Sequence, residues 1–200
     1  YIDGIYYKYT DDGSALKVVR GYKPYRGKVE IPATVNGLPV TEVDGLAMYA
    51  CYYLKELVIG DNVKKCGHEA FGASINLCNV TLPVADVEFT HNWMFNCDRG
   101  IREIHCRSSI PYVVDEGIFN GAVDYDKCIL YVPVGTKQSY ANSEVWKNFT
   151  HIVEENVSTN ISNINVEKKS VWHTLQGVKL FAKPNIPGVY IHNGKKIIVR

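Results

Sequence analysis

Five segments of this chain carry the same apolar pattern at intervals of 23 to 28 residues. The clearest copies are Leu54-x-x-Leu57-x-Ile59, Leu77-x-x-Val80-x-Leu82 and Ile101-x-x-Ile104-x-Cys106, and shorter copies occur at Val29-x-Ile31 and Leu130-x-Val132. A unit of this length cannot bury its apolar side alone, so it stacks on equivalent units. The pattern therefore predicts a solenoid in which each coil contributes one short parallel strand.

Two further columns of residues recur in phase with these strands. Large apolar side chains stand 23, 24 and 24 residues apart at Met48, Phe71, Phe95 and Phe119. Five residues before each of them stand Val43, Cys66, Thr90 and Val114. Several columns in one register indicate that the large residues fill the core of successive coils.

The segments Val63–Phe71 and Ala47–Leu57 resemble the unit V-x-x-I-G-x-x-A-F-x-x-C-x-x-L-x-x-I-x-I-P of the BspA-like (TpLRR) leucine-rich repeats of bacterial surface proteins. Prolines that follow the strands match the proline of that unit at Pro32, Pro83 and Pro133. The coil from Val84 to Phe95 lacks the I-G and A-F dipeptides. The resemblance implies an α/β leucine-rich-repeat right-handed solenoid, dominated by short parallel strands with little helix. It also implies an extracellular or outer-membrane surface location in Bacteroidetes.

The ends of the array have their own signals. Strand-like runs at Ile5–Tyr9 and Ala15–Val19 flank Asp12-Gly13, so residues 1–27 are expected to form a hairpin that covers the first coil. Residues 128–155 are similar to the closing unit of the same repeats. In this unit we expect Thr136 to cap a short helix that runs to about Ser143. Bulky side chains for closing the core stand at Trp146, Phe149 and Ile152.

The chain changes character after the array. We expect residues 1–155 to form the solenoid, 156–165 a polar linker and 166–200 a small all-β module. Asn193-Gly194 predicts a tight hairpin in this module, because both residues of its turn need positive φ. The module resembles the strands of type IX secretion sorting domains, and a folded tail that packs on the repeats is the alternative.

Composition excludes several classes of partner. The net charge is +1 with interspersed signs, which argues against nucleic acid. No run reaches the about 18 apolar residues of a membrane helix. A signal peptide is absent at Tyr1, and for an exported protein we expect it to have been removed.

The six cysteines are expected to be free. Cys78 and Cys128, for example, fall in one column two coils apart, about 10 Å and beyond disulfide reach.

The sequence offers no constellation for catalysis. The six histidines form no H-E-x-x-H motif and no C-x-x-C pair occurs. Cys66 and His68 are close enough in sequence to share a metal, but the core column favours burial of Cys66. His105 and Cys106 alternate along a strand and point to opposite faces. Asp11, Asp12 and Asp61 are too few for a calcium loop. We therefore expect a protein that is not an enzyme and holds no metal or cofactor.

With catalysis set aside, two classes of function remain, which are binding of a partner and a structural spacer role. One outward residue of each strand forms the candidate contact row Glu30, Val58, Thr81, His105 and Tyr131. We expect a monomeric, non-catalytic module that binds a protein or glycan, such as a host molecule in adhesion. The alternative is a structural spacer that displays another element. Tyrosines are also concentrated near the start, with 9 of 14 in the first 53 residues. They favour either packing of the cap or a second contact surface.

Overall fold

The computed structural model describes residues 1–90, 93–96, 100–157, 172–174, 179–180, 188–192 and 195–199. The chain forms two compact units, Tyr1–Val157 and Ser158–Arg200, which are described separately.

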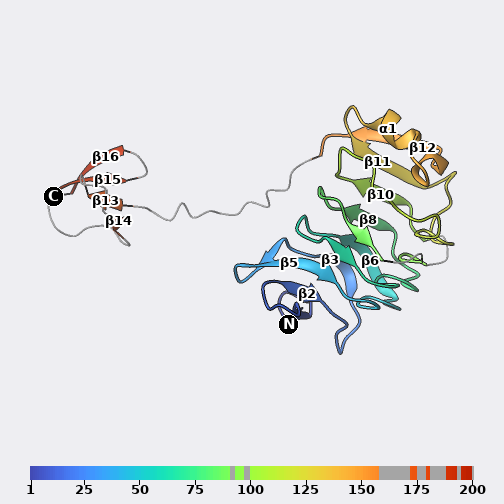
Figure 1. Cartoon of the computed structure of the whole chain (residues 1–200), viewed down its shortest axis with the longest axis horizontal. Helices are drawn as coiled ribbons and strands as arrows, with labels where there is room; N and C mark the ends of the chain where they lie inside the picture. Colours follow the sequence, from blue (N-terminus) through green and yellow to red (C-terminus); the bar gives the residue numbers. More distant parts are fainter. Residues whose placement is uncertain are drawn as a thin grey trace. The chain divides into compact units, whose positions relative to one another are not determined.

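One parallel sheet collects a strand from each coil of the first unit (Figure 1). Its strands follow the chain order and are β3 (Arg26–Glu30), β6 (Tyr53–Val58), β8 (Asn79–Leu82), β10 (Glu103–Cys106), β11 (Ile129–Pro133) and β12 (His151–Glu155). All five repeated segments of the sequence lie in or directly beside one of these strands, which confirms the predicted solenoid. The sixth strand, β12, comes from the closing unit.

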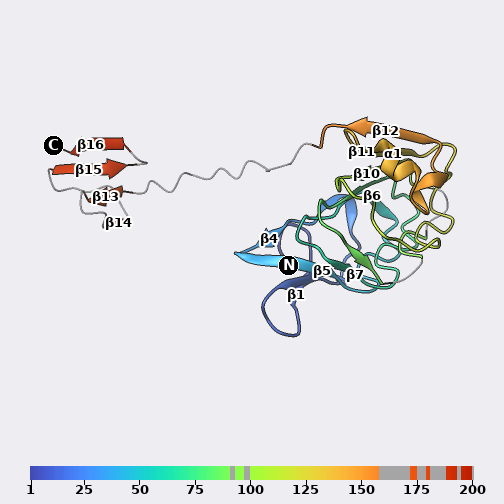
Figure 2. The same cartoon turned by 45° about the horizontal axis from the view of Figure 1, so that its top comes forward.

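A second sheet lies on the opposite side of the solenoid (Figure 2). It consists of β1 (Tyr7–Tyr9), β2 (Leu16–Val18), β4 (Thr34–Val35), β5 (Leu38–Val43), β7 (Lys65–Cys66) and β9 (Glu88–Phe89). Here the predicted column needs a correction, because Val43 pairs with Cys66, and Cys66 pairs with Phe89. Thr90 is displaced by one residue and bonds the Cys66 carbonyl with both its N–H and its hydroxyl. The displacement falls in the coil that lacks the repeat dipeptides.

The N-terminal hairpin forms and joins the first coil, at the β5 edge of the second sheet. β1 and β2 pair antiparallel, and β2 then joins β5 in parallel. This pairing extends the second sheet, and it leaves Val18 fully buried. The strand β3 is left as the outermost strand of the first sheet in the part of the chain that the structure describes.

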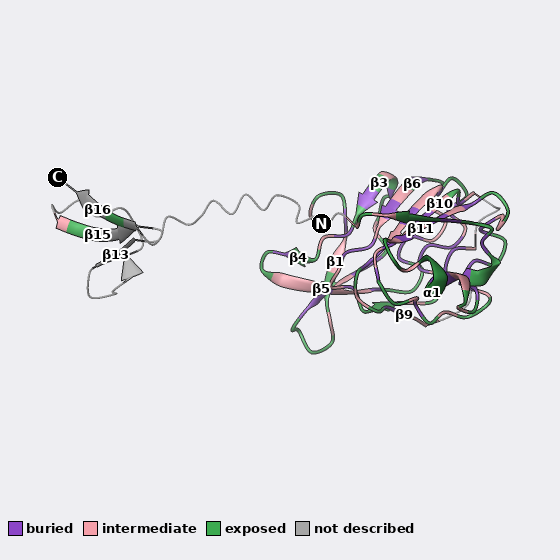
Figure 3. Cartoon of the chain, turned by 90° about the horizontal axis from the view of Figure 1, so that it is seen from above, coloured by how far each residue is buried: buried purple, intermediate pink, exposed green. Residues whose placement is uncertain are grey.

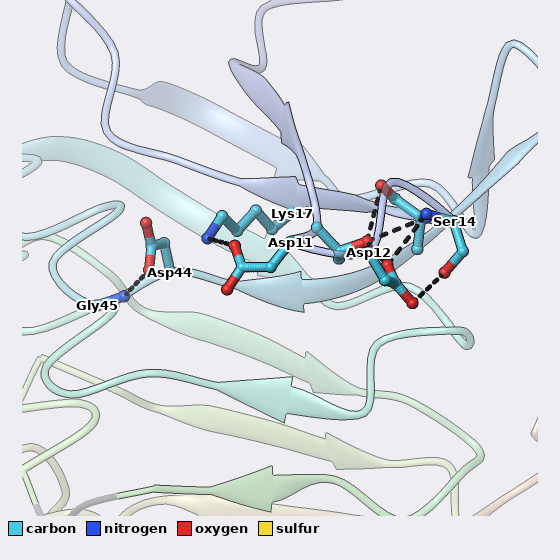
Figure 4. Close-up of polar contacts among 8 residues, drawn as sticks. Asp11, Asp12, Ser14, Lys17, Asp44 and Gly45 are labelled. Atoms are coloured by element: carbon cyan, nitrogen blue, oxygen red, sulfur yellow. Dashed lines mark hydrogen bonds and ion pairs between the residues drawn. The ribbon is translucent and has the colours of Figure 1, made fainter.

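The hairpin loop is closed by one aspartate (Figure 4). Asp12 accepts hydrogen bonds from the Thr10 hydroxyl at 2.6 Å, from the Ser14 hydroxyl at 2.7 Å and from the Ser14 N–H at 3.0 Å. These donors, with Thr10 the strongest, lower the pKa of Asp12 to about 2. Asp11 instead lies 3.7 Å from the Lys17 ammonium group. The two aspartates are thus engaged within the loop.

The turns between the sheets form a third line of contacts between coils. Residues on either side of Met48 and of Phe71 adopt positive φ, namely Leu46 and Ala50, and Glu69 and Ala73. This conformation directs backbone N–H groups toward the next coil. The N–H of Met48 donates to the Ala70 carbonyl at 2.7 Å. Equivalent bonds run from Ala50 to Gly72, from Phe71 to Met94 and from Ala73 to Asn96.

Figure 3 colours the buried segments of the first unit purple. The burial of its residues confirms the predicted core column. Met48, Phe71, Phe95 and Phe119 are all buried. The rings of Phe71 and Phe95 stack with centroids 5.4 Å apart, and those of Phe95 and Phe119 with centroids 5.7 Å apart. Trp146 meets Phe119 edge-on at 5.7 Å and closes the stack. Phe149 and Ile152 are also buried, as the closing unit predicted.

The closing unit contains the short helix α1 (Lys137–Ala141) and the 3-10 turn η1 (Trp146–Asn148). The helix ends before the predicted Ser143, and its cap differs from the prediction. The Thr136 hydroxyl donates backward to the Pro133 carbonyl at 2.7 Å. The carboxylate of Glu154 on β12 accepts the N–H of Lys137 at 3.0 Å instead. A side chain from the neighbouring strand therefore caps the helix.

The second unit is an antiparallel sheet with the strand order β14-β13-β15-β16. Its strands are β13 (Trp172–Thr174), β14 (Lys179–Leu180), β15 (Gly188–His192) and β16 (Lys195–Val199). The pairing of His192 with Lys195 confirms the predicted hairpin strands. The Asn193-Gly194 turn and most of the predicted linker lie outside the described residues, and the sorting role stays a prediction.

The aromatic stack generates a stability prediction. Replacing Phe71 with Ala leaves a cavity between two stacked coils and is expected to cost about 3 to 5 kcal/mol of unfolding free energy. Phe71→Leu keeps most of the volume and should cost clearly less. Urea unfolding measures both changes. Equal stability of the wild type and Phe71→Ala would contradict the assigned core.

Close approach of two turns generates a second prediction. A Cβ atom added to Gly67 would lie 2.5 Å from the backbone nitrogen of Gly45. Gly67→Ala should therefore force the two coils apart and cost about 1 to 3 kcal/mol. Gly45→Ala is the matched control, since its nearest new contact is 3.4 Å from the His68 carbonyl oxygen. Thermal melting should separate the two variants, and identical melting temperatures would refute the close stacking.

Candidate binding face

The outward face of the first sheet carries the predicted contact row. The strand registers place Glu30 beside Val58, Val58 beside Thr81, Thr81 beside His105 and His105 beside Tyr131. The inward neighbours of these residues along the strands are buried. The five residues therefore lie side by side on one face of the sheet, and a partner contact there stays a prediction.

The structure adds Val153 of β12 to this row, beside Tyr131. Sequence reasoning missed it, although the alternation around the inward Ile152 carried the signal. Val153 is 44% exposed and brings an apolar side chain next to the tyrosine.

Charges near β3 neutralise one another. The Lys28 ammonium group lies 3.1 Å from the Glu56 carboxylate and 3.7 Å from that of Glu30. The hydrogen bond that Lys28 donates to the Glu56 carboxylate is the main reason that the pKa of Lys28 is raised. The Arg26 guanidinium lies 4.3 Å from the centre of the Tyr53 ring. This end of the face therefore offers a polar surface in which the cations already have partners.

The other end of the row holds two aromatic rings in a fixed arrangement. The rings of His105 and Tyr131 are stacked with centroids 4.4 Å apart and an angle of 5° between their planes. The Nδ1 atom of His105 lies 2.8 Å from the Glu155 carboxylate, and its Nε2 atom lies 3.8 Å from that of Glu103. Two carboxylates and one ring thus hold the histidine from three sides.

Arg107 links neighbouring coils at the edge of this face. The sequence analysis did not identify this residue. Its guanidinium donates to the Leu82 carbonyl at 3.1 Å and to the Ile59 carbonyl at 2.9 Å, and it pairs with Asp61 at 2.8 Å. The side chain is 11% exposed and spans two coils. Its signal in the sequence was an arginine in the column where Pro32, Pro83 and Pro133 stand.

Three buried thiols of the described residues are unsuited to nucleophilic chemistry. Cys51, Cys66, Cys78, Cys106 and Cys128 are free, whereas Cys97 lies outside the described residues. Burial raises the pKa of Cys66 and Cys106, and it raises the pKa of Cys128 to about 12. These thiols stay protonated, and the thiolate is the reactive form. Cys106 is fully buried below the outward His105, as predicted.

The described residues hold no cluster of metal-ligating side chains. No three His, Cys, Asp or Glu side chains gather there as metal ligands. Cys66 and His68 do not form the metal site considered from the sequence, because the Cys66 side chain is buried while that of His68 is half exposed. The Nε2 atom of His68 lies 3.3 Å from the Glu69 carboxylate. No helix of these residues is long and apolar enough to cross a membrane.

Comparison with solved structures places this architecture among known folds. The chain is similar to a leucine-rich repeat protein of T. pallidum (TpLRR), with 19% sequence identity and a TM-score of 0.50 over 78% of this chain and 82% of that chain. A leucine-rich cell surface protein from Faecalibacterium prausnitzii A2-165 matches at 15% identity and a TM-score of 0.23, over 100% of this chain and 60% of that chain. No family model and no curated protein matches. The first likeness shows the fold, which is that of a leucine-rich-repeat solenoid.

Proposed function

We propose that this chain is a non-catalytic protein-binding module of a secreted or cell-surface bacterial protein. The contact surface is the outward face of the first sheet. The observation that carries the proposal is the stacked pair of His105 and Tyr131, held by Glu155 on a rigid sheet. The likeness of its repeat units to those of bacterial surface proteins supports the location.

Preorganisation makes this pair suited to recognition. Binding normally costs free energy to order side chains, about 0.5 to 1.5 kcal/mol for each flexible side chain. Here the stacking contact and the Glu155 contact restrict both rings before a partner arrives. Tyrosine also combines apolar area with a polar tip, and such residues dominate the energy of many interfaces. The half-exposed Val153 next to Tyr131 adds apolar area to the same spot.

The charge pattern favours a protein over a polyanion. Glu103 and Glu155 flank His105, and Glu30 and Glu56 flank Lys28. Phosphate-rich partners need a continuous basic surface, which these carboxylates interrupt. A protein surface can match alternating charges at the rim and an aromatic contact at the centre. Adhesion to a host protein is the biological role that we propose for this surface.

The proposal is tested by surface plasmon resonance with a panel of purified extracellular matrix proteins. For a protein that binds, Tyr131→Ala and His105→Ala should each weaken the affinity about thirtyfold, the effect of a hot spot of about 2 kcal/mol. Their melting temperatures should stay close to that of the wild type, because neither side chain lies in the core.

Tyr9→Ala is the matched control. It removes a tyrosine that is 64% exposed on β1, in the other sheet, and should leave the affinity unchanged. If the double variant of His105 and Tyr131 keeps full affinity, the contact surface lies elsewhere. If the wild type binds none of the panel, the spacer function of the solenoid gains support.

A further inference from the structure

The tyrosine-rich N-terminal end contains a cavity that the proposed protein contact leaves unused. Its volume is about 270 Å³, and it lies between the first residues of the chain and the outermost strand β3. Its charged lining side chains are those of Asp3, Glu30, Lys23, Arg26 and Lys28, beside a group of tyrosines. Glu30 belongs to the contact row, whereas His105 and Tyr131 lie at the other end of that row.

One side of the cavity is aromatic and firmly held. The rings of Tyr1 and Tyr6 have centroids 4.5 Å apart, and Tyr6 meets Tyr25 edge-on at 6.3 Å. The hydroxyl of buried Tyr25 donates to the Val19 carbonyl at 2.8 Å and accepts the N–H of Tyr6 at 3.2 Å. Tyr1 remains 74% exposed. An anchored tyrosine thus supports a second and a third ring that line the cavity.

The remaining lining is charged with both signs. Asp3 and Gly4 adopt positive φ at the tip of a turn, which the backbone bonds between Ile2 and Ile5, both 2.9 Å, hold closed. Glu30 and Lys28 project from β3, where their ion pair and the bond from Lys28 to Glu56 fix them. The cavity therefore presents carboxylate acceptors and ammonium donors beside an aromatic wall.

We propose that this cavity binds a pyranose ring of a glycan. Sugar hydroxyls both donate and accept hydrogen bonds, so they match carboxylates and ammonium groups together. The C–H face of the ring packs against the negatively polarised face of tyrosine. The volume lies just below the about 300 to 1,000 Å³ of pockets for drug-sized ligands, which suits a single ring.

Other ligand classes fit this lining less well. A purely apolar ligand would cover Asp3 and Glu30 without replacing their hydrogen bonds to water, which costs free energy. A polyanion would meet the same two carboxylates, and two of the three lining cations already have partners, since Lys28 is paired with Glu30 and Glu56 and Arg26 lies over the Tyr53 ring. An extended peptide along the edge of β3 would use backbone hydrogen bonds and would not depend on the Tyr1 ring.

The test uses the full chain on an array of glycans that end in neutral hexoses, N-acetylhexosamines or sialic acids. The class that binds is then titrated as its methyl glycoside, with the protein followed by NMR. Tyr1→Ala should weaken binding about tenfold through loss of ring stacking, and Tyr1→Phe should retain it. Tyr9→Ala should bind like the wild type, since Tyr9 does not line the cavity.

Tyr131→Ala distinguishes glycan binding in the cavity from protein binding at the contact row. This variant should weaken protein binding and leave glycan binding unchanged. Unchanged melting temperatures would show that the variants are folded. Absence of glycan binding by the wild type would overturn the proposal. So would equal binding by Tyr1→Ala and Tyr9→Ala, or an equal loss in Tyr1→Ala and Tyr1→Phe.

Discussion

Backbone hydrogen bonds from each coil to the next are the interaction on which the rest of this structure depends. A coil of 23 to 28 residues is too short to bury its own apolar side. The strands of the first sheet, the strands of the second sheet and the bonded turns, such as Met48 to Ala70, supply three lines of such bonds. Together they hold successive coils in register, so equivalent residues of neighbouring coils meet. The aromatic stack from Phe71 to Phe119 follows from that register.

The same register builds the surface. Because side chains alternate along a strand, burial of one column exposes the column beside it. His105 and Tyr131 become neighbours only because β10 and β11 pair at this register, and Glu155 reaches His105 from β12. Arg107 then ties the ends of β6 and β8 through their carbonyl oxygens. The candidate binding face is consequently as rigid as the stack of coils beneath it.

Periodic features of the sequence predicted the periodic features of the structure. The strands, the core column and the contact row all repeat along the chain, so their spacing was readable. Contacts made by a single side chain with a residue far away in the sequence were not predicted. Glu154 caps α1 from a neighbouring strand. The N-terminal hairpin pairs with β5, and Val18 is buried at that contact. The displacement of Thr90 occurs in the coil where the repeat dipeptides are missing, so only the spacing from Phe95 predicted its position.

Hydrogen–deuterium exchange of the full chain tests the cooperative stacking of coils most directly. If neighbouring coils stabilise one another, the bonded amides of β6, β8 and β10 should open together with a single free energy. Those at the outermost strand β3 should exchange faster, because β3 has a strand partner on one side in the described sheet. Separate opening free energies for β8 and β10, or faster exchange at β10 than at β3, would contradict a solenoid that is held by contacts between its coils.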